Sequence, residues 1–193
     1  MILLVNACVR KESRTKRLAD AVTARMGGDV QEVKVWETDL PVADEAFLEK
    51  RDALIAGEVW SDPMFDLARQ FAEADTIVVA APYWDLSFPA ALKQYFEQVN
   101  LTGITFRYTP EGVPEPMCKA GRLIYVMTAG GTFVPEEFGF GYVKALAQSF
   151  YGIEDVELIK AVGLDTDGAD AEGIMEEAIR EMEQNVDRGM AWE

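Results

Sequence analysis

A short polar segment near the start of the chain has the composition of an anion-binding site. The fully apolar run 2–5 predicts a buried parallel strand. The segment 10–15, Arg-Lys-Glu-Ser-Arg-Thr, follows it, and apolar residues at helical spacing begin at Leu18. Amide groups at a helix start and the positive end of the helix dipole attract anions, and serine and threonine hydroxyls add donors. The segment therefore predicts a phosphate site between a strand and a helix.

The glycine-rich phosphate motifs are missing from this segment. It contains neither the GxGxxG pattern of dinucleotide-binding folds nor the GxxxxGK[ST] pattern of P-loops. What remains is a hydroxyl-lined site with few glycines. Such a site suits a terminal phosphate, as in the binding of flavin mononucleotide (FMN).

The charge distribution supports a phosphate ligand. The chain has 34 acidic and 18 basic residues, so its net charge of −16 repels anions overall. Five basic residues nevertheless lie within eight positions: Arg10, Lys11, Arg14, Lys16 and Arg17. Cations at a helix start are mildly unfavourable with the dipole, and a bound dianion would explain them. A solvated helix start is the alternative.

The residue types of the chain exclude several kinds of chemistry. It has no histidine, which excludes Ser-His and Cys-His hydrolase sites, histidine-ligated metals and imidazole proton transfer. Cys8 and Cys118 form no CxxC or metal-ligand spacing, so we expect no metal and a reduced, cytoplasmic protein. The acidic balance argues against nucleic acid, and the sequence predicts no membrane span and no signal peptide.

The order of apolar segments predicts an α/β fold. With 193 residues and 49% hydrophobic content, the chain predicts a single domain, 1–193. The patterns predict strands over 2–5, 30–36, 75–81, 123–128 and 156–162, and helices from residue 18 onward and over 45–57, 63–74, 89–99, 141–151 and 169–189. This alternation predicts a flavodoxin-like, doubly wound parallel sheet of order 2-1-3-4-5 with helices on both faces. Its ligand lies beyond the carboxyl ends of strands 1 and 3.

Two further loops follow the predicted third and fourth strands. The segment 82–89 carries Tyr83 and Trp84 behind a proline, which suits a flat, amphipathic ligand, although both rings could simply cover the core. The segment 128–132 contains Gly130 and Gly131, which let a backbone approach a ligand closely, although an ordinary turn would also explain them. Three compatible loops at the places that the fold predicts make a ligand site the stronger interpretation.

Several motifs in the chain resemble one flavoenzyme family. They are the segment GITFRYT at 103–109 with Glu111-Gly112, a strand ending in Thr-x-Gly-Gly, the Ser-x-Thr-x-x-Leu pattern from Ser13, the Pro-x-aromatic loop 82–86 and the segment KQYFE at 93–97. Together they are similar to the FMN-dependent NADH-azoreductases, which are flavodoxin-like NAD(P)H:quinone oxidoreductases. The resemblance covers about residues 2–162 and is most specific over 82–131.

The resemblance implies a role for residues in each loop. It implies that the FMN phosphate is held by Arg10, Ser13, Arg14 and Thr15. It implies that the flavin ring is lined by Pro82, Tyr83, Trp84, Asp85 and Leu86, with Thr128, Ala129, Gly130 and Gly131 at its pyrimidine side. The family often has asparagine where this chain has Asp85, and a carboxylate there would lower the flavin potential.

The resemblance also implies a homodimer with active sites at the subunit interface. An insertion at about 101–121 would help to shape the pocket, and a hairpin there would place Phe106 and Tyr108 on one face. The candidate substrate-pocket residues are Trp84, Phe88, Phe106, Tyr108, Phe133 and Phe138. They suit a largely apolar pocket for NADH or NADPH and for small aromatic acceptors.

The favoured interpretation is a ping-pong oxidoreductase that uses FMN and NAD(P)H to reduce quinones, azo or nitro compounds. The flavin would carry the chemistry, which explains how a chain without histidine can be an enzyme. A flavodoxin-type electron carrier without NAD(P)H turnover is the alternative, and a flavin-free signalling or scaffold domain is a third. The physiological acceptor and the choice between NADH and NADPH stay open.

Overall fold

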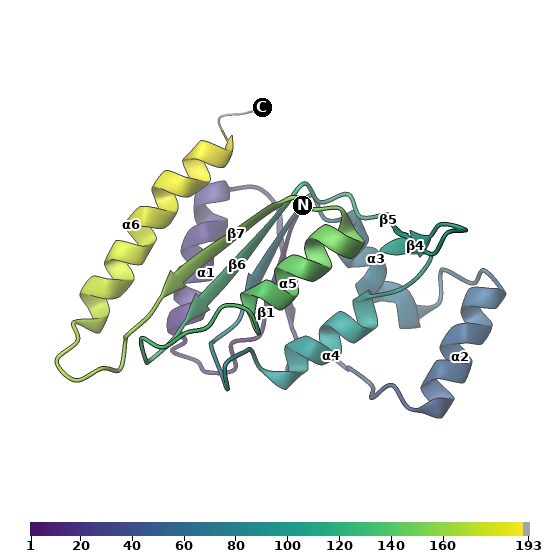
Figure 1. Cartoon of the computed structure of the whole chain (residues 1–193), viewed down its shortest axis with the longest axis horizontal. Coiled ribbons are helices and arrows are strands. Elements are labelled where there is room, and N and C mark those ends of the chain that lie inside the picture. The colour runs from purple at the N-terminus through teal and green to yellow at the C-terminus, as the bar shows by residue number, and fades with distance from the viewer. Residues whose placement is uncertain (191–193) are drawn as a thin grey trace.

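The computed structural model describes residues 1–190 and contains one parallel sheet of five strands (Figure 1). Its strands are β1 (Ile2–Asn6), β2 (Val30–Lys34), β3 (Thr76–Ala80), β6 (Arg122–Thr128) and β7 (Asp155–Ala161). Their order is β2-β1-β3-β6-β7. The predicted doubly wound order is confirmed. Two further strands of the described residues, β4 (Phe106–Tyr108) and β5 (Pro114–Pro116), form a separate hairpin, so β6 and β7 are the fourth and fifth strands of the sheet.

Helices cover both faces of the sheet. The helices of the described residues are α1 (Arg14–Met26), α2 (Glu45–Ala56), α3 (Asp66–Glu73), α4 (Ala90–Val99), α5 (Phe140–Leu146) and α6 (Ala171–Met190), with a 3-10 turn at Pro63–Phe65 and a π-helical turn at Ala147–Tyr151. Helix α2 lies beside the sheet and packs on the 3-10 turn and α3 instead. Alternate residues of β1 face opposite sides: Leu4 packs with α1 and α6, and Leu3 packs with α3, α4 and α5. No described helix is both long and apolar enough to cross a membrane.

Four loops meet at the carboxyl edge of the sheet. Backbone hydrogen bonds keep neighbouring strands in step at this edge: Ala7 donates to Ala80, Ala81 donates to Val126, and Ala129 donates to Ala161. The segments that follow β1, β3, β6 and β7 therefore begin side by side. This edge is where an open α/β sheet binds its ligands.

The predicted insertion forms a hairpin at the opposite end of the sheet. Strands β4 (Phe106–Tyr108) and β5 (Pro114–Pro116) pair antiparallel. The hairpin packs against the π-helical turn Ala147–Tyr151, which precedes the first residue of β7. Figure 1 shows it at the end of the sheet away from the arrowheads of β6 and β7.

Candidate functional site

A cavity of about 240 Å³ lies at the carboxyl edge of the sheet. The predicted residues that line it are Arg10, Ser13, Arg14, Thr15, Pro82, Tyr83, Trp84, Thr128 and Gly130. Sequence reasoning missed four further lining residues: Cys8, Val9, Glu12 and Asp165. Asp165 follows β7, so the rule that drew attention to the loops after strands 3 and 4 would also have found it.

The start of α1 offers donors to a ligand in the cavity. Ser13 is the N-cap residue, and its Oγ accepts a hydrogen bond from the amide of Lys16 at 3.2 Å. Within the described chain, the amides of Arg14 and Thr15 have no acceptor. Free amides in the first turn of a helix are the groups that bind anions.

A buried pair of hydroxyls joins the first loop to the third. Thr15 and Thr128 are 1% and 8% exposed, and their hydroxyl oxygens lie 2.6 Å apart. One hydroxyl donates to the other, so the second keeps its own proton for another acceptor. The pair therefore holds the two loops together and leaves one donor for a ligand.

Carboxylates partner three of the five clustered cations. Lys16 lies near Asp20 and Glu32, and Arg17 pairs with Glu172, all outside the cavity lining. Arg14 lies in the cavity wall, where its guanidinium is 2.8 Å from the Asp165 carboxylate. These pairs explain much of the cation cluster without a bound dianion. Asp20 comes from the same helix, whereas Glu32, Asp165 and Glu172 come from other segments of the chain.

Asp165 lies directly against Gly130. Its amide donates to the Gly130 carbonyl at 2.9 Å, and a Cβ atom at Gly130 would overlap with its carboxylate. The neighbouring Gly131 has open space where a side chain would be. Of the two tandem glycines, Gly130 is therefore the one that the packing requires.

The loop after β3 ends in a tight turn. Trp84 and Ser87 exchange two backbone hydrogen bonds, and Asp85 and Leu86 between them have φ of 50° and 65°. Positive φ at both central positions is typical of a type I′ turn and is strained for leucine. Asp85 and Leu86 form the turn tip and are not among the cavity-lining residues, so the predicted site extends only as far as Trp84 in this loop.

The predicted substrate-pocket aromatics do not form one pocket within the chain. Trp84 lines the cavity and is 40% exposed. Phe88 packs against Phe96 and Tyr142, and Phe106 stacks on Phe150 with ring centroids 4.5 Å apart. The remaining three, Tyr108, Phe133 and Phe138, are largely exposed and do not line the cavity. Of the six, only Trp84 is brought into the cavity, because Phe88 and Phe106 fill core space instead.

Burial controls the ionisation of groups in the cavity wall. It raises the pKa of the Cys8 thiol to about 11, although hydrogen bonds from Ser13 and Thr15 and the charge of Lys16 act against this shift. Burial, together with the charge of Glu137, also raises the pKa of the Tyr83 phenol. Both groups therefore stay protonated near neutral pH and supply no base. Among the described residues, no group of carboxylates and cysteines is arranged to hold a metal ion.

Comparisons with known proteins place the chain in a family. Residues 1–186 match the family described as having a flavodoxin-like fold. The chain is 34% identical over 184 residues to the FMN-dependent NADH:quinone oxidoreductase of Coprothermobacter proteolyticus, and the aligned region covers 90% of each chain. It is 36% identical over 185 residues to the enzyme of the same name from Lachnoclostridium phytofermentans, and the aligned region covers 91% of this chain and 92% of the relative.

Solved structures agree on the fold. An azoreductase from Bacillus anthracis superposes with a TM-score of 0.83 at 23% identity, covering 97% of this chain and 98% of that one. An FMN-dependent NADH-azoreductase from the same species, solved in complex with FMN, gives a TM-score of 0.80 at 21% identity and covers 97% of both chains. The chain therefore belongs to the flavodoxin-like family that includes the FMN-dependent NADH:quinone oxidoreductases, as its motifs indicate.

Proposed function

We propose that this protein binds FMN in the carboxyl-edge cavity and uses it to oxidise NADH or NADPH and reduce quinones, azo or nitro compounds. One observation carries the proposal. The free amides of Arg14 and Thr15 lie beside the Thr15–Thr128 hydroxyl pair in a cavity whose other wall is aromatic. The amides and hydroxyls suit a phosphate, and the aromatic wall suits a flat ring. The named activities of the relatives support the same proposal.

The lining residues divide into two groups that suit the two ends of FMN. The amides at the start of α1, the Ser13 hydroxyl and the guanidinium of Arg10 would hold the phosphate. Pro82, Tyr83 and Trp84 would lie along the ring, with Thr128 and Gly130 at its polar edge. Bound FMN would supply the chemistry by accepting a hydride and passing reducing equivalents to an acceptor.

The residues of the chain itself bind and orient rather than transfer protons. The sequence has no histidine. Cys8 and Tyr83, the cavity groups with shifted pKa values, both stay protonated near neutral pH because burial disfavours their anions. We therefore assign the protein the tasks of holding the ligands in line and limiting water at the ring. Two free cysteines are compatible with the cytoplasmic location that we propose.

We also propose that the active unit is a homodimer. Trp84, Phe133 and Phe138 are exposed aromatics in the loops after β3 and β6, at the same edge as the cavity. The hairpin aromatic Tyr108 is 52% exposed at the other end of the sheet. Exposed aromatics are typical of interfaces, and only a second copy could bring the hairpin near a cavity.

Anaerobic stopped-flow spectroscopy tests the proposed function. Purified protein is first loaded with FMN and then mixed with NADH or with NADPH, without oxygen. We expect flavin absorbance to bleach and then to return when a quinone is added, with parallel lines in double-reciprocal plots. If neither nicotinamide bleaches the flavin but a reductase protein does, the chain is an electron carrier. Sedimentation of the FMN-loaded protein at micromolar concentration tests the dimer.

A further inference from the structure

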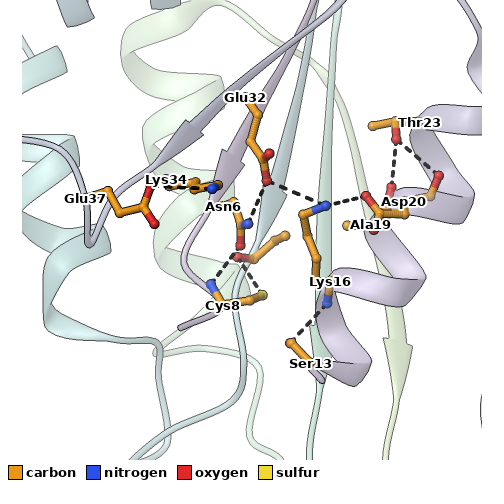
Figure 2. Close-up of polar contacts among 11 residues, drawn as sticks. Asn6, Cys8, Ser13, Lys16, Ala19, Asp20, Thr23, Glu32, Lys34 and Glu37 are labelled. Carbon is orange, nitrogen blue, oxygen red and sulfur yellow. Dashed lines mark hydrogen bonds and ion pairs between the residues drawn. The ribbon is translucent and has the colours of Figure 1, made fainter. Parts of the chain in front are cut away.

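A set of polar contacts links the edge of the sheet to the loop that begins at Cys8 (Figure 2). Asn6 is the last residue of β1 and is 2% exposed. Its Oδ1 accepts a hydrogen bond from the Cys8 amide at 2.8 Å, and its Nδ2 donates to the Glu32 carboxylate at 2.7 Å. A donor on one side and an acceptor on the other therefore fix the orientation of the Asn6 amide group.

Glu32 is held in turn by α1. The Lys16 ammonium lies 3.6 Å from the Glu32 carboxylate and 2.5 Å from that of Asp20. Burial alone would lower the pKa of Lys16, but the hydrogen bonds and charges of Asp20 and Glu32 together raise it, so the ammonium stays charged. Because the Lys16 amide also donates to Ser13, the Asn6–Glu32–Lys16 network reaches the N-cap of α1.

The strand register explains why these groups meet. Leu4 of β1 is paired with Glu32 of β2, and residues two apart on a strand share a face. Asn6 and Glu32 therefore lie on the face that α1 covers. A buried amide on such a face is costly unless its hydrogen bonds are made. An apolar residue would be the simpler choice there, which indicates that the amide has a specific task.

The network encloses the segment that forms one wall of the cavity. The segment runs from Cys8 to Ser13, and its middle residues, Val9 to Glu12, are exposed. Asn6 fixes its first residue through the Cys8 amide, and Ser13 fixes its last residue as the helix cap. Asn6 and Glu32 themselves do not line the cavity.

We propose that Asn6 and Glu32 are positioning residues that hold the Cys8–Ser13 segment in its phosphate-binding conformation before the ligand arrives. The proposal rests on the proposed function, since it assumes a phosphate-bearing ligand at the start of α1. A segment that is already ordered loses less conformational entropy when it binds, so its affinity is higher. The pair acts through the Cys8 amide and touches no ligand.

An exchange of the two side-chain types tests the proposal. Asn6→Asp places two carboxylates against each other and should weaken FMN binding by about tenfold or more, because the hydrogen bond becomes a repulsion. Glu32→Gln keeps an acceptor and should change affinity little. In the double variant N6D/E32Q, Gln can donate to Asp while Asp still accepts from the Cys8 amide. We expect it to recover affinity to within about threefold of the parent.

FMN dissociation constants are measured by quenching of flavin fluorescence, alongside thermal unfolding of each protein without FMN. Gln31→Ala is the matched control. Gln31 lies next to Glu32 on β2 and accepts a hydrogen bond from Gln70, away from the cavity. We expect this control to bind FMN like the parent. Equal FMN affinity in the parent and N6D, or a double variant that recovers thermal stability but not affinity, would overturn the proposal.

Hydrogen exchange separates this inference from the proposed function. In protein without FMN, the Cys8 amide should exchange faster in N6D than in the parent and should be protected again in the double variant. If the parent binds no FMN, the proposed function fails, and the phosphate-binding role of the pair fails with it. Unchanged Cys8 exchange in N6D contradicts the positioning of the segment whatever the ligand is.

Discussion

The carboxyl-edge loops and the β4–β5 hairpin are both rich in aromatic residues, but the two regions use them differently. At the carboxyl edge, Trp84 lines a cavity and is 40% exposed. In the hairpin, Phe106 is 5% exposed and stacks on Phe150, with Tyr108 edge-on at 5.4 Å. The first region places rings in a cavity wall, where we propose that they meet a ligand, and the second uses its inner ring to attach an insertion to the domain.

The difference teaches that place in the fold is a better guide to function than aromatic content. Loops at the carboxyl edge gather side chains from four separate segments, which is what a ligand site requires. The hairpin contacts the π-helical turn Ala147–Tyr151, at the amino end of the sheet. Within one chain, it can stabilise the fold but cannot line the cavity.

Removing one ring from each region tests whether the two regions have separate roles in stability and FMN binding. Phe106→Ala should lower the free energy of unfolding by about 3–5 kcal/mol, because it leaves a cavity under the hairpin. It should leave FMN affinity per folded chain close to that of the parent. Trp84→Ala should weaken FMN binding and change the free energy of unfolding little. Urea unfolding and FMN titration of both variants measure the two effects. If Phe106→Ala loses FMN affinity in a protein that is still folded and keeps the oligomeric state of the parent, the separation of the regions is wrong.

The second test reverses one positive charge inside the carboxyl-edge cavity and, in a separate variant, one outside it. Arg14→Glu reverses a charge in the cavity wall, and Arg17→Glu makes the same change three residues further along α1, at a residue paired with Glu172. Hydrogen bonds to charged groups contribute about 1.5–3 kcal/mol, so Arg14→Glu should weaken FMN binding by roughly tenfold to a hundredfold. Arg17→Glu should have little effect. Equal losses in both variants would mean that overall charge, rather than the cavity, governs FMN affinity.

Local sequence patterns were sufficient to predict the fold. The apolar runs predict the five strands, and their alternation with helices predicts the strand order. The apolar spacing places the first helix only from Leu18 onward, whereas the Ser13 cap starts α1 at Arg14. The alternation of Phe106, Arg107 and Tyr108 in the expected insertion predicts the hairpin, in which the rings of Phe106 and Tyr108 are in contact. Helix ends differ from the prediction: the predicted helix 63–74 begins as a 3-10 turn, and the predicted helix 141–151 ends as a π-helical turn.

Long-range pairing is what the sequence could not show. Arg14 and Asp165 are separated by 151 positions, and so no spacing pattern indicates that one neutralises the other. The same applies to Phe106 and Phe150, whose stacking removes Phe106 from the list of pocket residues. A residue type and a loop position predict that a side chain is near an edge, but packing decides what it touches.

The third test compares two adjacent glycines at the carboxyl edge. Gly130→Ala places a methyl group against the Asp165 carboxylate, so Asp165 must move and its ion pair with Arg14 must rearrange. We expect FMN affinity to fall about tenfold, or about 1.4 kcal/mol. Gly131→Ala meets open space and should bind FMN like the parent. Fluorescence titration of the two variants decides the matter, and equal affinities would mean that the Asp165–Gly130 contact is dispensable.

The last test, with the smallest expected effect, compares how the two cysteines, one in each region, change the pH dependence of stability. Burial raises the pKa of Cys8 at the cavity to about 11 and that of Cys118, near the hairpin, to about 12. The folded protein therefore binds each thiol proton more tightly than the unfolded chain, whose cysteines ionise near pH 9. The stability that this supplies is fully present below pH 9 and is lost as the pH rises through the folded values.

Between pH 8 and pH 10, each thiol should account for about 1 kcal/mol of lost stability, since only the unfolded chain releases its proton over this range. The two losses should be nearly equal, because pH 10 is still below both folded pKa values. Buried tyrosines such as Tyr95 add to the loss at higher pH, since burial raises their pKa as well. Urea unfolding of the parent, Cys8→Ala and Cys118→Ala at both pH values measures the difference. Each variant should lose less stability than the parent by the same amount, and an identical pH dependence in all three proteins would show that neither thiol is buried as described.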